Sequence, residues 1–134
     1  MLKKNLPAFA LIVIIIGSFA FRPIINRTST FITCDKVFRF DGGSVDDPTN
    51  YTDITGTSPS TFCPSPGHTL CVLCVKTSVV YTQADADASP SDQITNDWVG
   101  QPKVDQSGFH GDINTAVTNG ANFSGTDYDI YTKP

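Results

Sequence analysis

Glutamate is absent from this chain of 134 residues, in which all 13 acidic residues are aspartate. Leucine is also scarce: beyond residue 20 only Leu70 and Leu73 occur, whereas Ser and Thr together number 26. Asp, Ser and Thr compete for backbone hydrogen bonds and favour turns, while Thr and Val favour extended backbone. The composition therefore predicts a mainly β fold with much irregular loop.

The familiar catalytic signatures are missing as well. The chain has no G-x-S-x-G elbow, no H-E-x-x-H zinc motif and no phosphate-binding glycine loop. His110 has Asp112 two positions away, but no serine stands at a spacing that fixes the geometry of a catalytic triad. We therefore expect neither an enzyme nor a bound cofactor.

The chain also lacks any cluster of Lys and Arg. Removing residues 1–20 takes away Lys3 and Lys4, so that nine basic residues become seven and the net charge falls from −4 to −6. A surface of that sign repels nucleic acid and anionic lipid. We expect no nucleic-acid partner.

No apolar run is long enough to span a membrane with ease. The longest, residues 6–16, reaches sixteen residues even when it is extended to Phe21, whereas a spanning helix needs about 20. The two lysines before it and the small residues up to Ala20 complete the layout of a secretory signal peptide. We predict that residues 1–20 are removed between Ala20 and Phe21 and that the protein acts in the periplasm, at the cell surface or outside the cell. The alternative is an uncleaved anchor, with the leader as the only membrane contact.

The remaining chain is expected to form one small domain over residues 30–134, after a flexible lead-in over 21–29. Leu, Ile, Val and Phe make up 25 of its 114 residues, slightly above the roughly one-fifth below which chains tend to be disordered. Residues 30–40 are predicted to be extended, and residues 69–82, β-branched and aromatic without Gly or Pro, are the predicted centre of a sheet. Frequent glycines predict an irregular C-terminal third.

Three cysteines and a histidine lie within twelve positions, in CPSPGHTLCVLC. As zinc ligands, Cys63, His68, Cys71 and Cys74 have a spacing that matches none of the usual zinc motifs. Since side chains alternate along a strand, Cys71 and Cys74 are expected on opposite faces. A thioredoxin-like pair needs its C-x-x-C at the start of a helix, and the flanks here are strand-like. We therefore predict no metal at this cluster.

Disulfide bonds are the favoured interpretation, because an exported chain with an even number of cysteines keeps them paired. Two prolines and a glycine turn the chain between Cys63 and Cys71, which favours a bond between them. Cys34 is then left for Cys74. Four cysteines allow three pairings, so these two pairs are a preference among alternatives. His68, on the turn, is expected to be a solvated loop residue.

Several short stretches resemble a family of short exported proteins of unknown function from Bacteroidota. These are the opening LPAFALIV, the SFAF cleavage region, CPSPGHTLC, the following VVYT and the ending DIYTKP. Members of that family usually have two cysteines, whereas this chain has four. The resemblance implies export and a bacterial envelope setting, with no known activity.

Two hypotheses of function follow. In the preferred one, the chain is a small disulfide-stapled module, without catalytic activity, that binds an unknown partner in the envelope or outside the cell, or has a structural role there. In the alternative, the cluster from Cys63 to Cys74 carries out thiol or metal chemistry.

Overall fold

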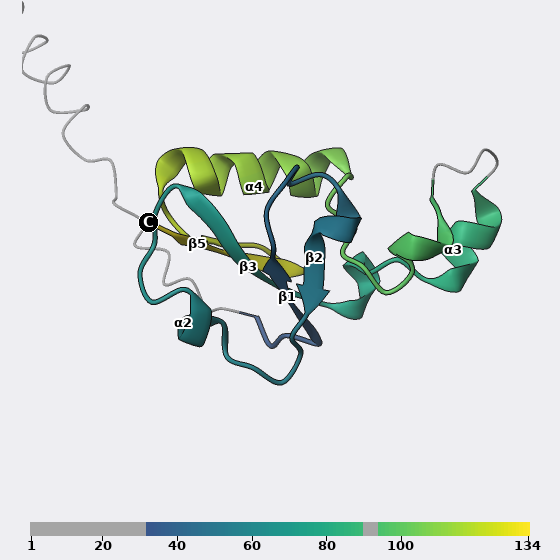
Figure 1. Ribbon diagram of the computed structural model, residues 1–134, viewed down its shortest axis with the longest axis horizontal. Helices are drawn as coiled ribbons and strands as arrows, with labels where there is room; N and C mark the ends of the chain where they lie inside the picture. The colour runs from purple at the N-terminus through teal and green to yellow at the C-terminus, as the bar shows by residue number, and fades with distance from the viewer. Residues whose placement is uncertain (1–31, 90–93) are drawn as a thin grey trace, which may run out of the picture.

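The computed structural model describes residues 32–89 and 94–134, so the predicted leader, the predicted cleavage between Ala20 and Phe21 and the predicted lead-in over residues 21–29 lie outside the described residues. The described chain forms a five-stranded antiparallel sheet in the order β2-β1-β3-β5-β4 (Figure 1). The strands are β1 (Lys36–Phe40), β2 (Tyr51–Asp53), β3 (Thr69–Val75), β4 (Phe123–Ser124) and β5 (Tyr128–Lys133). The predicted mainly β class is confirmed.

Short helices connect the strands, and one longer helix covers the sheet. The α-helices are α2 (Pro59–Phe62), α3 (Gln83–Ala88) and α4 (Ser107–Asn119), and the 3-10 helices are η1 (Pro48–Asn50), η2 (Thr77–Val79) and η3 (Asn96–Trp98). In Figure 1, α4 lies along one side of the sheet and α2 lies on the other. The domain thus has two layers, with its main core between α4 and the sheet.

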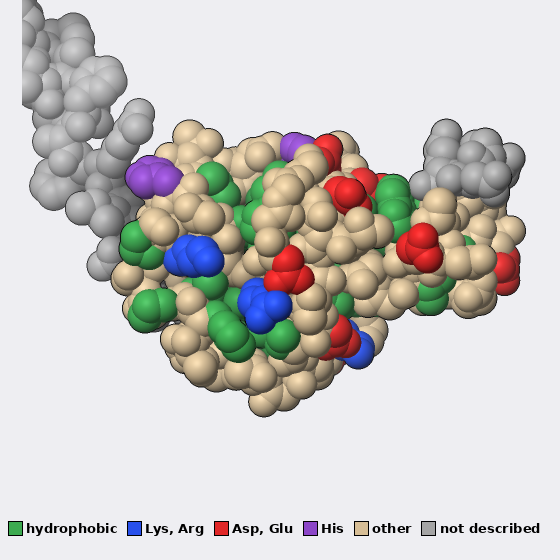
Figure 2. Space-filling model, viewed as in Figure 1, with side chains coloured by type: hydrophobic (Ala, Val, Ile, Leu, Met, Phe, Trp, Pro, Cys, Tyr) green, Lys and Arg blue, Asp and Glu red, His purple; other side chains and the backbone are tan. Residues whose placement is uncertain are grey.

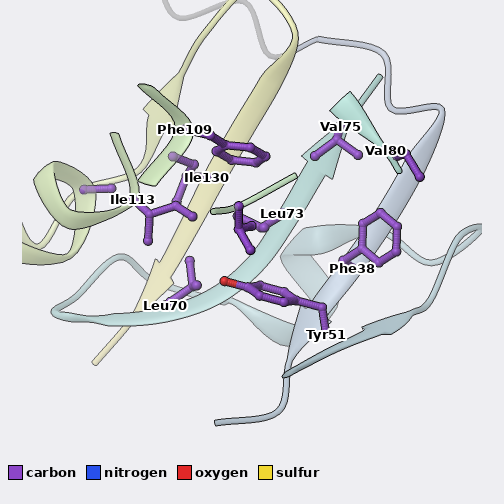
Figure 3. Close-up of a cluster of buried hydrophobic side chains, with 11 residues drawn as sticks. Phe38, Tyr51, Leu70, Leu73, Val75, Val80, Phe109, Ile113 and Ile130 are labelled. Atoms are coloured by element: carbon purple, nitrogen blue, oxygen red, sulfur yellow. The ribbon is translucent and has the colours of Figure 1, made fainter. Parts of the chain in front are cut away.

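The central strand β3 is the one predicted from its β-branched residues, although it ends at Val75 instead of continuing to residue 82. Alternate residues of neighbouring strands meet α4, and Figure 3 shows their side chains pointing toward one another. The buried members of this core are Phe38, Tyr51, Leu70, Leu73, Val75, Val80, Val104, Phe109, Ile113, Ala116 and Ile130.

Helix α4 corrects the expectation of an irregular C-terminal third. Phe109, Ile113 and Ala116 are buried, and their spacing of four and three residues puts them on one face of a helix. Gly120 ends the helix in the left-handed conformation, with φ 61°. Packing of this apolar face on the sheet outweighs the poor helix propensity of the two glycines within α4.

His68 is exposed, as a loop residue should be, but it is not simply solvated. Its Nδ1 lies 2.9 Å from the carbonyl oxygen of Val117, in the last turn of α4. The imidazole also packs on Gly120, where an added Cβ would lie 2.8 Å from the His68 Cε1 atom. His68 therefore packs against the C-terminal end of α4, where the Val117 carbonyl oxygen also accepts a hydrogen bond of 3.2 Å from the Gly120 N–H.

Side-chain amides bond to backbone groups on both sides of the sheet. On the β5 side, where the two-residue edge strand β4 pairs only with Asp129 and Ile130, the Asn122 Oδ1 atom accepts a hydrogen bond of 2.9 Å from the Thr132 N–H. At the β2 edge, the Gln101 amide, oriented so that its nitrogen donates, lies 3.0 Å from the Tyr51 carbonyl oxygen. Exposed strand edges are templates for pairing with other chains, so these contacts protect the sheet against strand addition.

Candidate functional site

A β-bulge in β3 places the cysteines on one face of the sheet. The register between β3 and β5 shifts between Leu70 and Val72. Leu70 packs in the core under α4, whereas Cys71 and Val72 both pack in a cluster on the opposite face. Cys74 lies opposite Val37, a member of that same cluster. The predicted placement of Cys71 and Cys74 on opposite faces was wrong, because the bulge breaks the simple alternation.

We call this side of the sheet, away from α4, the disulfide face. Cys34 is bonded to Cys74, with Cα atoms 5.2 Å apart, and Cys63 to Cys71, with Cα atoms 6.1 Å apart. These distances are usual for disulfides, and the two pairs are those that the sequence favours. The presence of disulfide bonds is thereby confirmed. Cys74, Cys71 and Cys63 are 0%, 3% and 7% exposed, so three of the four sulfur-bearing residues are buried.

The sulfur atoms of the disulfide face are all engaged in the two disulfide bonds. Within the described residues no cysteine is free, and no group of three His, Cys, Asp or Glu side chains is placed to hold a metal ion. His68, a candidate fourth ligand, is directed to the end of α4 instead of to the sulfurs.

A fully buried carboxylate, Asp129, lies beside the Cys34–Cys74 bond. Asp129 pairs with Cys74 across β3 and β5. Its Oδ2 atom accepts a hydrogen bond of 2.7 Å from the Ile32 N–H, and its Oδ1 atom accepts one of 2.5 Å from the Ser124 hydroxyl. Burial and the Asp129 charge together raise the pKa of Tyr131. The sequence does not predict that Asp129 is buried and hydrogen-bonded, because its partner Ile32 lies 97 positions away.

Residues 32–35, which we call the entry strap, bring the chain onto the disulfide face. The Asp35 N–H donates to the Val75 carbonyl oxygen at 3.0 Å. The Asp35 carboxylate accepts a hydrogen bond of 3.0 Å from the Thr77 N–H. The strap is thus tied to the end of the central strand by backbone contacts as well as by the Cys34–Cys74 bond.

The second histidine does not form a catalytic triad. His110 Nδ1 lies 3.9 Å from an Asp46 oxygen, whereas Asp112 accepts a hydrogen bond of 2.7 Å from the Tyr128 hydroxyl. The Ser44 hydroxyl donates to Asp46 and lowers the pKa of that carboxyl. In a catalytic triad the histidine lies between the serine and the carboxylate. Here the Asp46 carboxylate lies between Ser44 and His110 instead.

A second feature, which the sequence did not reveal, is a lobe that projects from one end of the domain. Tyr81 and Gly100 are linked by a hydrogen bond of 2.8 Å from the Gly100 N–H, and Val80 pairs with Pro102. This short two-stranded neck brings the ends of residues 82–99 together, and Figure 1 shows α3 and η3 beyond it, away from the sheet. We call the described residues of this segment, 82–89 and 94–99, the projecting lobe.

Side chains around Tyr81 fix the neck. The Tyr81 hydroxyl donates to Asp105 at 2.6 Å, and the Trp98 ring packs against the Tyr81 ring with centroids 5.5 Å apart. Lys103 Nζ lies 5.4 Å from the centre of the Tyr81 ring and 3.2 Å from an Asp85 oxygen. Burial, together with the bond to Asp105, raises the pKa of Tyr81. These contacts join the lobe to the domain through an aromatic and ionic cluster.

The surface of the projecting lobe is polar and acidic. The described residues of the lobe contain three Asp (Asp85, Asp87 and Asp97) and no Lys or Arg, and Figure 2 shows carboxylates on this part of the molecule. Helix α3 buries none of its residues and is held by a capping box between Thr82 and Asp85. Gln83 donates hydrogen bonds to Asp87 at 2.9 Å and to Asn96 at 3.2 Å. These polar contacts order the lobe without giving it a core of its own.

Comparison with known proteins finds no matching family model, no matching curated protein and no matching solved structure. In the part of the chain that the structure describes, no helix is both long and apolar enough to cross a membrane. The function is therefore inferred from the chain's own residues.

Proposed function

We propose that this chain is an exported module without catalytic activity that binds a partner in a bacterial envelope or outside the cell, or has a structural role there. The two disulfide bonds support an oxidising location, because cytosolic thiols are kept reduced. The signal-peptide layout of residues 1–20 and the resemblance to short exported Bacteroidota proteins support the same location.

We propose that the projecting lobe is the binding surface. The observation that supports this choice most directly is that the contacts of the neck hold the lobe in a fixed position. One face of the sheet is covered by α4, the disulfide face carries the entry strap and the Cys63–Cys71 loop, and side-chain amides bond to the backbone of β2 and β5. The lobe alone stands clear of this body while Tyr81 and Lys103 hold it in one position. Binding residues are commonly found on loops that a rigid scaffold positions.

Site-specific photo-crosslinking in the producing cell tests this surface. A photo-reactive residue replaces Asp97, an exposed position of η3, and a matched control carries it at Asn114, an exposed position of α4. We expect a discrete adduct from position 97 and none from position 114. Trp98→Ala should abolish the adduct while the circular dichroism spectrum stays native. Equal adducts from both positions, or adducts unaffected by Trp98→Ala, would contradict the proposal.

A further inference from the structure

The two disulfides differ in how a reductant can approach them. Cys63 and Cys71 are 7% and 3% exposed, so both ends of their bond are buried. Cys74 is fully buried, but its partner Cys34 is only partly buried. Thiol–disulfide exchange requires a thiolate to reach one sulfur of the bond. Cys34 is therefore the most accessible point of attack among the four.

The more accessible bond is also the one that closes the longer loop. Cys34 and Cys74 are 40 positions apart, against 8 for Cys63 and Cys71. The first bond joins the entry strap to β3, the central strand of the sheet. Within the described residues, the strap has few other ties: the Ile32 N–H to Asp129 and the contacts of Asp35 with Val75 and Thr77.

We propose that the Cys34–Cys74 bond is a redox-sensitive latch, which a dithiol reductant opens before the Cys63–Cys71 bond. A thiolate of the dithiol attacks the Cys34 Sγ atom, forms a mixed disulfide with it and expels the Cys74 thiolate, which takes up a proton. The second thiolate of the dithiol then displaces Cys34, which is protonated in turn. The protein bond gains two electrons, and the dithiol leaves as an intramolecular disulfide.

Opening the latch changes the stability of the domain and the environment of Asp129. Losing a cross-link of this loop length lowers the ratio of folded to unfolded protein by about a thousandfold in the loop-entropy model. Release of the strap also breaks the hydrogen bond from the Ile32 N–H to the buried Asp129 carboxylate and lets water reach it. The latch therefore makes the stability of the domain depend on the reducing power of its surroundings.

Partial reduction of the native full chain tests the order of opening. The protein is treated briefly with substoichiometric dithiothreitol, quenched with iodoacetamide, and its labelled cysteines are located by peptide mass spectrometry. We expect initial labelling of Cys34 and Cys74 to exceed that of Cys63 and Cys71 by on the order of tenfold. The same treatment in guanidinium chloride is the control, because unfolding exposes both bonds and should abolish the preference.

The experiment uses wild-type protein, so its result does not depend on whether a variant folds. Equal initial labelling of the two pairs in native protein, or earlier labelling of Cys63 and Cys71, would overturn the latch. A second readout is pulse proteolysis of the partly reduced sample: molecules labelled at Cys34 should be cleaved faster than molecules with both bonds intact. Equal cleavage of the two populations would show that the bond does not control stability.

Discussion

Removing the Cys34–Cys74 bond should destabilise the domain more than removing the Cys63–Cys71 bond. We compare Cys34→Ser with Cys74→Ser in one variant and Cys63→Ser with Cys71→Ser in the other. The loop-entropy model gives about 4 kcal/mol for the 40-residue separation of the first bond and about 2.5 kcal/mol for the 8-residue separation of the second. Since a domain with so small a core has a net stability of about 5 kcal/mol, the first variant should be barely folded.

The position of each bond in the fold also predicts that losing Cys34–Cys74 destabilises the domain more than losing Cys63–Cys71. Cys34–Cys74 fastens the entry strap to the central strand, whereas Cys63–Cys71 fastens the short α2 segment to one end of that strand. A serine at position 74 also puts a hydroxyl where the sulfur was fully buried. Variants that carry alanine in place of both cysteines of a bond lack that hydroxyl. Comparing the alanine and serine variants therefore separates the loss of the cross-link from the cost of burying a polar group.

Urea unfolding followed by circular dichroism and by the fluorescence of Trp98, the single tryptophan, measures the free energy of unfolding of each variant. The wild-type protein in reductant should be at least as unstable as the variant lacking Cys34–Cys74. The reasoning fails if the two variants lose equal stability, if the Cys63–Cys71 variant loses more, or if reduced wild-type protein keeps its native melting temperature.

Four further predictions concern metal, export, the sheet edges and pH. A chelator should leave the melting temperature unchanged, since the cysteines form disulfides; stoichiometric zinc in protein purified without added metal would contradict this. Residues 1–30 should direct export of a reporter that is active only outside the cytoplasm, and the mature chain should begin at Phe21; full-length protein in the membrane fraction would instead establish an anchor. Asn122→Ala and Gln101→Ala should each cost about 1 kcal/mol and increase self-association in sedimentation experiments; unchanged sedimentation would argue against a protective role of these amides. The pKa of Asp85 is lowered, first by hydrogen bonds within the capping box, so its contribution to stability is present above its ordinary pKa and lost as pH falls below it. The protection factors of the α3 amides, which correct for the intrinsic exchange rate at each pH, should therefore fall in acid, and Asp85→Asn should remove that dependence.

The features that depend on local chemistry could be predicted from the sequence. The mainly β class follows from the scarcity of helix formers, and β3 was found from its β-branched run. Disulfide bonding followed from the even number of cysteines and from a turn-forming stretch between Cys63 and Cys71. Each of these signals lies within a few residues of the feature that it predicts.

The features that depend on distant partners could not be predicted. Helix α4 contains Gly108 and Gly111, and its stability comes from burying an apolar face on strands far away in the sequence. The bulge at Cys71 is a matter of register with β5, which no local pattern of β3 specifies. Asp129 is buried beside a strap from the other end of the chain. In the same way, the neck of the projecting lobe is made by residues far apart in the sequence, such as Val80 and Pro102, which are 22 positions apart.

The Cys34–Cys74 bond also sets the path that mechanical tension takes through the molecule. A force applied between the chain entry and the projecting lobe passes from Cys34 to Cys74 through the sulfur atoms and then along residues 75–82. Residues 35–73, with β1, β2 and α2, lie outside this covalent path. Of the central strand, the path includes only the last two residues, Cys74 and Val75, which pair with Val37 and Lys36 of β1. If the leader is retained as an anchor, a partner that pulls on the lobe loads the Cys34–Cys74 bond and the short stretch from Cys74 to the neck.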